Sequence, residues 1–332
     1  MVVTLKDVAE LAGVSRSAVS RTFTEGASVS KKTREKIEKA ASDLGYSPNA
    51  LASSLTTGRT KLIGLVSNNF HNPIFLEVFD LFTRGLQDRG LRPLLVNLTD
   101  EVDPENSNRM LRAYSVDGVI VASSTLPVSF AENFQNVGVP IVHSFGRQVP
   151  NPKVNVLGID NIDAGRLAAK TLIARGYKRI AFLGGPMDAT STQDRLLGFA
   201  EVVNATPHVS MTNSFATNYS FEAGRLEMTK LLLSTPAEAY FCGDDVLSIG
   251  ALSAIQSANV RVPEDIGVLG LNDMEMAGWE NINLTTIHNP IKHIIASSVE
   301  LIVASLDDST LQPESRLFDC HLVERGTLRP IR

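Results

Sequence analysis

The sequence predicts an α/β protein in which a helix-turn-helix headpiece precedes a two-lobed body of doubly wound parallel sheets. Three observations lead to this fold class. The first 60 residues hold short amphipathic helices, and from residue 61 onward short apolar strands alternate with amphipathic helices. This alternation continues past what one sheet would take and restarts near residues 155–160, and a chain of 332 residues is long enough for two or three domains.

The headpiece opens with two short helices. Thr4 and Asp7 are spaced as in a capping box, and the helix that they start ends at Gly13. Ser15 caps a second helix, which is expected over residues 16–23. Two helices joined by so short a turn have the layout of a helix-turn-helix.

A third helix is predicted over residues 31–44, and the composition then changes. Residues 50–55 read ALASSL, which can form about two turns of helix, and so short a helix is marginal in water by itself. We therefore expect a helix-turn-helix domain at residues 1–46, a hinge helix and linker at residues 47–60, and the body at residues 61–332.

The body is predicted to contain repeated βα units. Short apolar runs indicate strands at residues 62–66, 93–97, 117–122, 140–143, 179–183, 239–242 and 266–269. Helices fall between them, including residues 74–89, 163–175 and 246–258. We expect one lobe at about residues 61–158 and 290–318 and the other at about residues 159–289 and 319–332, with any ligand outside the carboxyl ends of the strands.

Charge and composition narrow the class of protein. Residues 1–61 hold ten basic and six acidic residues, a charge of +4. Because the whole chain has a net charge of −5, residues 62–332 carry −9. A basic head on an acidic body indicates that only the head meets a polyanion. No apolar run approaches the ~20 residues of a membrane span, and the start does not resemble a signal peptide. The two isolated cysteines are typical of a reducing cytoplasm.

Motifs for catalysis are absent from the sequence. It lacks a Gly-x-Ser-x-Gly elbow, a phosphate-binding loop, a Gly-x-Gly-x-x-Gly fingerprint and a His-Glu-x-x-His motif. Asp244, Asp245 and Asp273 fit ligand hydrogen bonding and helix capping better than acid–base or metal chemistry. Cys320 and His321 are too few for a metal site. We therefore expect no enzyme activity, no metal and no cofactor.

Several separated motifs resemble one family. Its headpiece is matched by residues 4–21 (TLKDVAELAGVSRSAVSR), 29–37 (VSKKTREKI) and 44–49 (LGYSPN). Its body is matched by residues 241–245 (FCGDD), 262–273 (VPEDIGVLGLND) and 284–287 (LTTI). These segments resemble the lactose-repressor/galactose-repressor (LacI/GalR) family of transcriptional regulators, and the likeness covers essentially the whole chain. It implies a cytoplasmic, homodimeric repressor of pseudo-palindromic operator DNA, with a periplasmic-binding-protein-like body that binds a small, sugar-like effector.

The resemblance assigns base contacts to the second helix, at Arg16, Ser17 and Arg21. Arginine can donate two hydrogen bonds to guanine, worth about 1–3 kcal/mol of discrimination, although an arginine that only grips phosphate or stays solvated remains the alternative. Helix capping and phosphate contact are both open for Ser15, Ser30 and Thr33.

Leu55 is the expected wedge of the hinge helix. In the family, paired hinges meet at the operator centre and insert leucines into a minor-groove base step, which kinks the duplex. Asn49 and Ala52 would be its neighbours in the groove. The alternative is that Leu55 packs against the body, but the small residues around it offer little core.

The resemblance also places effector-binding residues at strand ends and the following turns: Phe75, Asp160, Asn161, Arg195, Tyr219, Asp244 and Asn272. Carboxylates, amides and arginine suit hydroxyl groups, and an aromatic face suits a sugar ring. Phe75 is equally suited to the core and Tyr219 to the surface. His71 and Asn72 are loop residues that would line the mouth of the site, although a lone histidine is more often structural.

The chain departs from the family pattern at three places. Asn272 stands where an aspartate is common, and Ala189 stands where purine-responsive members carry an arginine, which argues against a purine. The segment before Arg147 is one residue longer than usual, so the roles of Phe145 and Arg147 stay open. Whether the effector induces or co-represses, and whether a protein partner on the first lobe replaces it, are also open. A sugar-binding receptor is the less favoured alternative.

Overall fold

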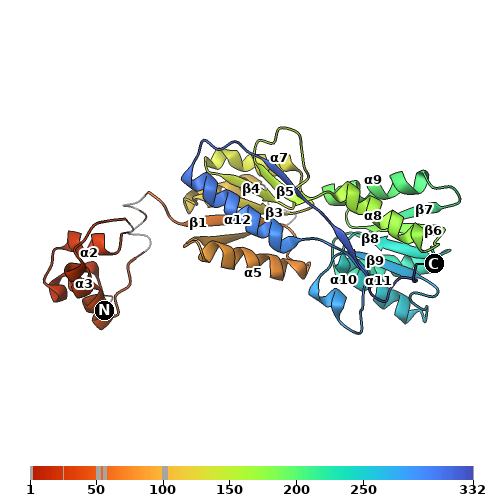
Figure 1. Ribbon diagram of the computed structural model, residues 1–332, viewed down its shortest axis with the longest axis horizontal. Helices are drawn as coiled ribbons and strands as arrows, with labels where there is room; N and C mark the ends of the chain where they lie inside the picture. Colours follow the sequence, from red (N-terminus) through yellow and green to blue (C-terminus); the bar gives the residue numbers. More distant parts are fainter. Residues whose placement is uncertain (1–2, 25, 50–53, 55–57, 99–103, 332) are drawn as a thin grey trace. The chain divides into compact units, whose positions relative to one another are not determined.

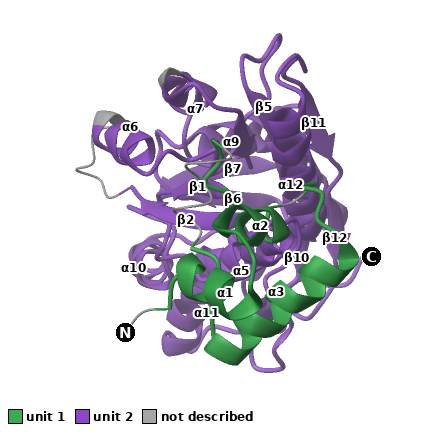
Figure 2. Ribbon diagram, turned by 90° about the vertical axis from the view of Figure 1, so that its left-hand side faces the viewer, with its two compact units in different colours: residues 1–61 green, residues 62–332 purple. Residues whose placement is uncertain are grey.

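The computed structural model describes residues 3–24, 26–49, 54, 58–98 and 104–331. It divides into two compact units, residues 1–61 and 62–332, which Figure 2 colours green and purple. Within the described ranges, no helix combines the length and the apolar character that crossing a bilayer requires.

The first unit packs three helices around a small core. They are α1 (Leu5–Ala12), α2 (Arg16–Thr22) and α3 (Lys31–Leu44). Each contributes one fully buried aliphatic side chain, Val8, Val19 and Ile37 respectively. The helices begin where the sequence predicts, because cap side chains satisfy N–H groups that lack an intrahelical partner: Ser15 Oγ accepts from Ala18 N at 3.2 Å.

The first sheet of the second unit has the strand order β11-β5-β4-β3-β1-β2, and all pairings between its described strands are parallel. Its strands are β1 (Leu62–Ser67), β2 (Arg92–Asn97), β3 (Gly118–Ala122), β4 (Ile141–Ser144), β5 (Asn155–Ile159) and β11 (Ser315–Phe318). Its helices are α5 (Ile74–Gln87), α6 (Pro104–Ala113), α7 (Val128–Glu132), η1 (Asn133–Val137) and α12 (Ile291–Asp307). Helices α5 and α12 lie against this sheet (Figure 1), and buried side chains of α6 and α7 form a hydrophobic cluster with it. We call the sheet with its helices lobe 1.

The second sheet has the order β12-β10-β9-β8-β6-β7 and makes lobe 2. Its strands are β6 (Arg179–Gly184), β7 (Ser210–Phe215), β8 (Ala239–Cys242), β9 (Gly267–Asn272), β10 (Thr286–His288) and β12 (His321–Val323), of which only β10 and β12 pair antiparallel among the described strands. Its helices are α8 (Asn161–Ala174), α9 (Thr190–Asn204), α10 (Phe221–Leu232), α11 (Asp245–Ser257) and η2 (Glu275–Gly278).

The chain passes between the two sheets three times in the described residues. The passages follow β5, β10 and β11, at residues 160, 289–290 and 319–320. The central strands β3 and β9 are buried along their whole length, as strands covered by helices on both faces are. The three passages hold the carboxyl ends of both sets of parallel strands on either side of one cleft.

The predicted fold class is confirmed, and seven strands, β1, β2, β3, β4, β6, β8 and β9, lie within a few residues of the apolar runs that indicated them. The other described strands, β5, β7, β10, β11 and β12, are not among the predicted strands. The edge strand β7 reads SMTNSF and is largely solvent-accessible, and β10 and β12 have three residues each. The exposed side chains of β7 and the short lengths of β10 and β12 leave no apolar run that would indicate these strands.

Candidate functional site

A cavity lies between the two lobes, at the carboxyl ends of their strands. Its lining residues are Asn69, Asn72, Ile74, Phe75, Val78, Ser124 and Phe145 from lobe 1, Arg195, Tyr219, Asp244 and Asn272 from lobe 2, and Asn289 and Ile291 at a passage between them. Its volume of about 30 Å³ is room for roughly two water molecules. We call this space the inner cavity.

Asp244 is the centre of the polar network in the inner cavity. Its Oδ2 accepts hydrogen bonds from Asn272 Nδ2 at 2.8 Å and from Asn72 Nδ2 at 2.9 Å, and its Oδ1 caps helix α11 by accepting from Val246 N at 2.8 Å. Burial raises the pKa of this carboxyl to about 6, although the hydrogen bonds and the charge of Arg195 lower it. Because Asn72 belongs to the other lobe, the Asn72–Asp244 bond joins the lobes directly.

Asn289 supplies an acceptor that no described residue satisfies. Its Nδ2 donates to Asn272 Oδ1 at 3.1 Å, but its own Oδ1 is buried and has no hydrogen-bond partner among the described residues. The side chain is 8% exposed and lines the inner cavity. A buried carbonyl oxygen without a donor costs about 1–3 kcal/mol, so this amide favours a ligand or water that donates a hydrogen bond.

Arg195 enters the cavity from helix α9 with its orientation fixed. Its Nε donates to Asn161 Oδ1 at 2.8 Å and its Nη1 to the carbonyl oxygen of Gly243. Helices α8 and α9 approach closely because Gly165 and Gly198 lie at their crossing, where a Cβ would collide with backbone of the other helix. Asn161 is therefore a residue that orients Arg195, and it is not among the residues that line the cavity.

Some of the other candidates predicted from the sequence line the inner cavity, and some do not. Phe75, Tyr219, Asp244 and Asn272 line the inner cavity, and Asn72 lies inside it. Asp160 instead caps helix α8, where its Oδ1 accepts from Asp163 N at 2.9 Å. The exposed His71 does not line the cavity. Sequence reasoning missed Asn69 and Ser124, which come shortly after the predicted strands 62–66 and 117–122, and Asn289, which follows β10, a strand that was not predicted.

Two side chains of the segment up to Arg147, which is one residue longer than the family pattern, point in different directions. Phe145 adopts a left-handed backbone, with φ of 67°, and lines the cavity. Arg147 leaves the cavity and reaches lobe 2, where its Nε donates to Asp194 Oδ2 at 2.7 Å and its Nη2 to the Thr190 carbonyl oxygen at 2.9 Å. Thr190 N also donates to the Thr125 carbonyl oxygen at 3.2 Å. The amino end of α9 is thus fastened to lobe 1.

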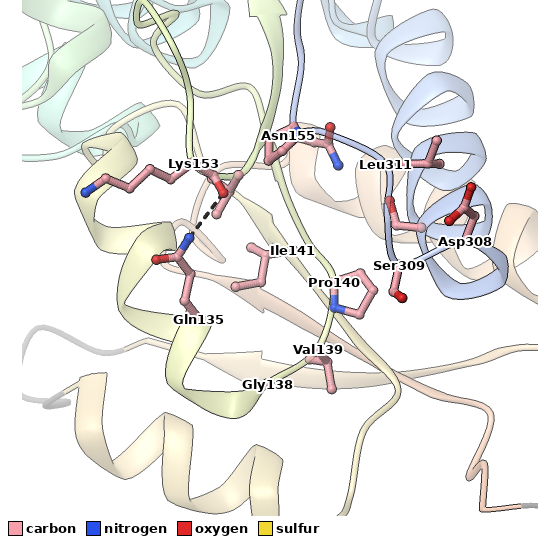
Figure 3. A pocket seen from close by; sticks show the side chains of 13 residues that line it. Gln135, Gly138, Val139, Pro140, Ile141, Lys153, Asn155, Asp308, Ser309 and Leu311 are labelled. Atoms are coloured by element: carbon pink, nitrogen blue, oxygen red, sulfur yellow. Dashed lines mark hydrogen bonds between the residues drawn. The ribbon is translucent and has the colours of Figure 1, made fainter.

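Another pocket, of about 330 Å³, lies in lobe 1 near the amino ends of β4 and β5 (Figure 3). Gln135 Nε2 donates there to the Lys153 carbonyl oxygen at 3.1 Å, and Pro140, Asn155 and Leu311 form part of its wall. The pocket is at the opposite end of the strands from the inner cavity. Ligands of parallel α/β sheets bind at the carboxyl ends, so we do not assign it to the effector site.

The first unit presents a polar surface on α2. Arg16, Ser17 and Arg21 are all exposed, as side chains that reach a DNA groove must be. The hydroxyl oxygens of Ser15 and Ser30 cap α2 and α3, and Thr33 Oγ1 lies 2.8 Å from Ser30 Oγ. Asn49 is exposed, whereas Ala52 and Leu55 lie outside the described residues.

Buried carboxylates outside the cavity have structural partners. Asp245, next to Asp244, accepts from Thr286 Oγ1 at 2.6 Å and from Met274 N at 2.8 Å. It thereby ties the start of α11 to β9 and β10. Among the described residues, no group of three or more His, Cys, Asp or Glu side chains is placed to hold a metal ion.

Comparison with known proteins places both parts of the chain. Residues 4–49 match the model of "Bacterial regulatory proteins, lacI family", and residues 169–328 match that of a periplasmic binding protein-like domain. The chain is 31% identical over 331 residues to the HTH-type transcriptional regulator CelR of Thermobifida fusca, covering 97% of each chain. It is 32% identical to the ribose operon repressor of Escherichia coli K12, covering 98% of this chain and 99% of the repressor.

Solved structures resemble the whole chain as well. A complex of CelR with cellobiose aligns over 98% of this chain and 99% of its own, with 29% identity and a TM-score of 0.72. The lac repressor dimer bound to operator and the anti-inducer ONPF aligns over the same shares, with 26% identity and a TM-score of 0.86.

Proposed function

This chain belongs to the lacI family of bacterial regulatory proteins and is a DNA-binding transcriptional regulator, and we propose that it is a dimeric repressor released from its operator by a polyhydroxylated small molecule in the inner cavity. The observation that carries the proposal is the Asp244 network. A buried carboxylate, amides from both lobes and the unpartnered Asn289 oxygen converge beside aromatic rings. Hydroxyl groups both donate and accept, so a sugar satisfies such a set.

The division of labour follows the three predicted segments. Residues 1–46 bind the major groove through α2, residues 47–60 form the hinge with Leu55 as its wedge, and residues 61–332 bind the effector and dimerise. Because it regulates transcription by binding DNA, the protein acts in the bacterial cytoplasm. The ribose operon repressor and the CelR–cellobiose complex support a sugar as the class of effector.

Release is driven by movement of the lobes. At about 30 Å³, the inner cavity has no room for a sugar ring, so effector entry breaks the Asn72–Asp244 bond and separates the lobes before they close on the ligand. We propose that the new arrangement of the lobes separates the paired hinges. The hinge helix then melts, because a helix this short is marginal without its partner, and the operator is released.

Exposed apolar side chains support assembly with a second copy. In lobe 1 they are Leu76 on α5 and Leu95 on β2, and in lobe 2 they are Phe221, Leu226 and Leu233 in and after α10. Where exposed apolar side chains form a contiguous patch they mark a protein interface, so we propose these residues as candidates for the dimer contact. The lac repressor structure is that of a dimer, and the family relationship supports the same assembly here.

A thermal-shift screen of the full chain tests the effector class. Sugars, sugar acids, sugar phosphates, nucleosides and purines are compared, because a ligand of the folded state raises Tm by mass action. We expect one sugar to raise Tm in the unsubstituted protein and in the exposed α8 control Lys170→Ala, and to lose this effect in Asp244→Ala. A purine that raises Tm where no sugar does, or a sugar shift that survives Asp244→Ala, contradicts the proposal.

A further inference from the structure

A second hollow adjoins the inner cavity. It has a volume of about 450 Å³ and is lined by Asn68, Asn69, Thr125, Leu126 and Pro127 of lobe 1 and by Pro186, Asp188, Ala189, Thr217, Asn218 and Tyr219 of lobe 2. We call it the outer groove. Asn69 and Tyr219 line both hollows, so the two spaces meet at these side chains. The residues of the outer groove follow the carboxyl ends of β1, β3, β6 and β7. The inner cavity differs in that Asn289, in a passage between the lobes, also lines it.

Tyr219, at the junction, is a rigid aromatic platform. It is 4% exposed, and its hydroxyl lies 2.6 Å from Thr192 Oγ1. The ring lies against the backbone at Gly185, where an added Cβ would fall well inside contact distance of three ring atoms. A glycine is required at that position for the ring to lie there. Fixed aromatic rings next to polar groups are suited to the apolar faces of sugar rings.

The lining of the outer groove selects for hydroxyl groups rather than for anions. Its polar side chains are three amides, two threonines, Tyr219 and one exposed carboxylate, Asp188, with no Lys or Arg among the described lining residues. The inner cavity holds one guanidinium, that of Arg195, which is already bonded to Asn161 and Gly243. A phosphate or carboxylate ligand would find the charge of Asp188 unfavourable there.

We propose that the effector is an uncharged two-ring glycoside, with one ring in the inner cavity and the second in the outer groove, joined past Tyr219. This inference rests on the proposed function, because it names the class of sugar that the same cleft binds. The volume of the outer groove is within the roughly 300–1,000 Å³ of small-molecule sites. Because its two walls come from different lobes, a second ring would also hold the lobes together.

Calorimetric titration of the full chain with matched ligand pairs tests this. The pairs are cellobiose with methyl β-glucoside, maltose with methyl α-glucoside, lactose with methyl β-galactoside, and xylobiose with methyl β-xyloside. Each methyl glycoside supplies one ring and the capped linkage but not the second ring. We expect at least one disaccharide to bind about tenfold or more tightly than its methyl glycoside.

Substitutions in the outer groove test whether this difference in affinity arises from contacts of the second ring with the groove. Asp188→Ala with Asn218→Ala changes two exposed side chains, so it spares the fold and is expected to bring the disaccharide to the affinity of its methyl glycoside. The double substitution is expected to leave the affinity for the methyl glycoside unchanged. The control Lys170→Ala should change the affinity for neither the disaccharide nor the methyl glycoside. Gly185→Ala displaces the Tyr219 ring and weakens both ligands.

The outcomes separate the two proposals. Equal affinity within every pair, or a disaccharide preference that survives the double substitution, overturns the two-ring inference while the cleft remains a sugar site. If no sugar of any pair binds, the two-ring inference is wrong, and the thermal-shift screen decides the proposed function; if sugar binding is untouched by Asp244→Ala, both are wrong.

Discussion

Asp244 carries most of the chemistry of the inner cavity at the scale of single residues. Its carboxylate is buried, accepts three hydrogen bonds and has the pKa raised to about 6 by burial. A carboxyl group with a pKa above its ordinary 3.8 binds its proton more tightly in the folded chain. Its contribution to stability is therefore complete below about pH 4 and is lost as the pH rises through about 6.

Asp244→Asn removes this titration. We expect the free energy of unfolding of the original protein to fall, relative to that of the variant, as the pH is raised from about 4 to about 7. Urea unfolding followed by Trp279 measures it, because the single tryptophan lies in lobe 2. Asp245, whose pKa is raised to about 7 by burial and further by the charge of Asp244, titrates in both proteins, so the difference between the curves reports Asp244 together with its effect on Asp245. Parallel stability curves would contradict the assignment.

Arg147 is predicted to favour the closed cleft without touching the ligand. Its bonds to Asp194 and Thr190 join lobe 1 to α9, and the ion pair is only partly screened by solvent. Arg147→Ala should weaken effector binding by about 1 kcal/mol, or roughly fivefold, and Asp194→Ala by a similar factor. In the double variant the losses should not add, because both remove one interaction.

The control for this pair is Arg166→Ala. Arg166 bonds to Asp163 and Glu201 within lobe 2, so its removal leaves the contacts between the lobes in place. Calorimetry should show unchanged effector affinity for it. Additive losses of affinity for Arg147→Ala and Asp194→Ala, or an equal loss for Arg166→Ala, would show that the Arg147–Asp194 ion pair does not act on cleft closure.

At the scale of elements, the crossing of α8 and α9 determines where Arg195 lies. A Cβ on Gly198 would collide with the Ile162 carbonyl, which belongs to backbone and cannot rotate away. Gly198→Ala should therefore destabilise the body by roughly 1–3 kcal/mol and weaken effector binding. A melting curve compares it with Glu201→Ala, an exposed change on the same helix. An unchanged Tm would mean that the helices separate freely.

Helix α2 is the element that the account assigns to the operator. Arg21→Ala should lower operator affinity by about 1–3 kcal/mol and relax base preference at one position of each half-site, while effector affinity stays unchanged. A binding assay against a set of single-base operator variants measures this. If the loss is equal for every base, Arg21 contacts phosphate, and the base contact predicted from the sequence is wrong.

The elements also show what a sequence can predict. The central strands and the capped helices are visible because their apolar runs and cap residues act locally. Asn289 and Arg147 are not, because their importance depends on pairing between segments far apart in the chain. Asp160 and Asn161 are predicted as ligand contacts from the resemblance; in the structure Asp160 caps α8, Asn161 accepts from Arg195, and neither lines the inner cavity, so their contact with a ligand stays a prediction. Motif position indicates a neighbourhood, and local hydrogen bonding decides the role.

At the scale of the whole molecule, the proposed mechanism couples the operator site and the effector site. The effector favours one arrangement of the lobes, and the operator favours the arrangement in which the hinges are paired. Such coupling is a free energy shared by both equilibria, so it has to be reciprocal. A ligand with equal affinity for both arrangements would shift neither, however tightly it bound.

The most direct test is a pair of titrations on the full chain with the sugar identified by the thermal-shift screen. Operator affinity is measured with and without saturating sugar, and sugar affinity with and without saturating operator. We expect the sugar to weaken operator binding and the operator to weaken sugar binding by the same factor. Operator affinity that stays constant or rises while sugar occupies the cleft would contradict this expectation.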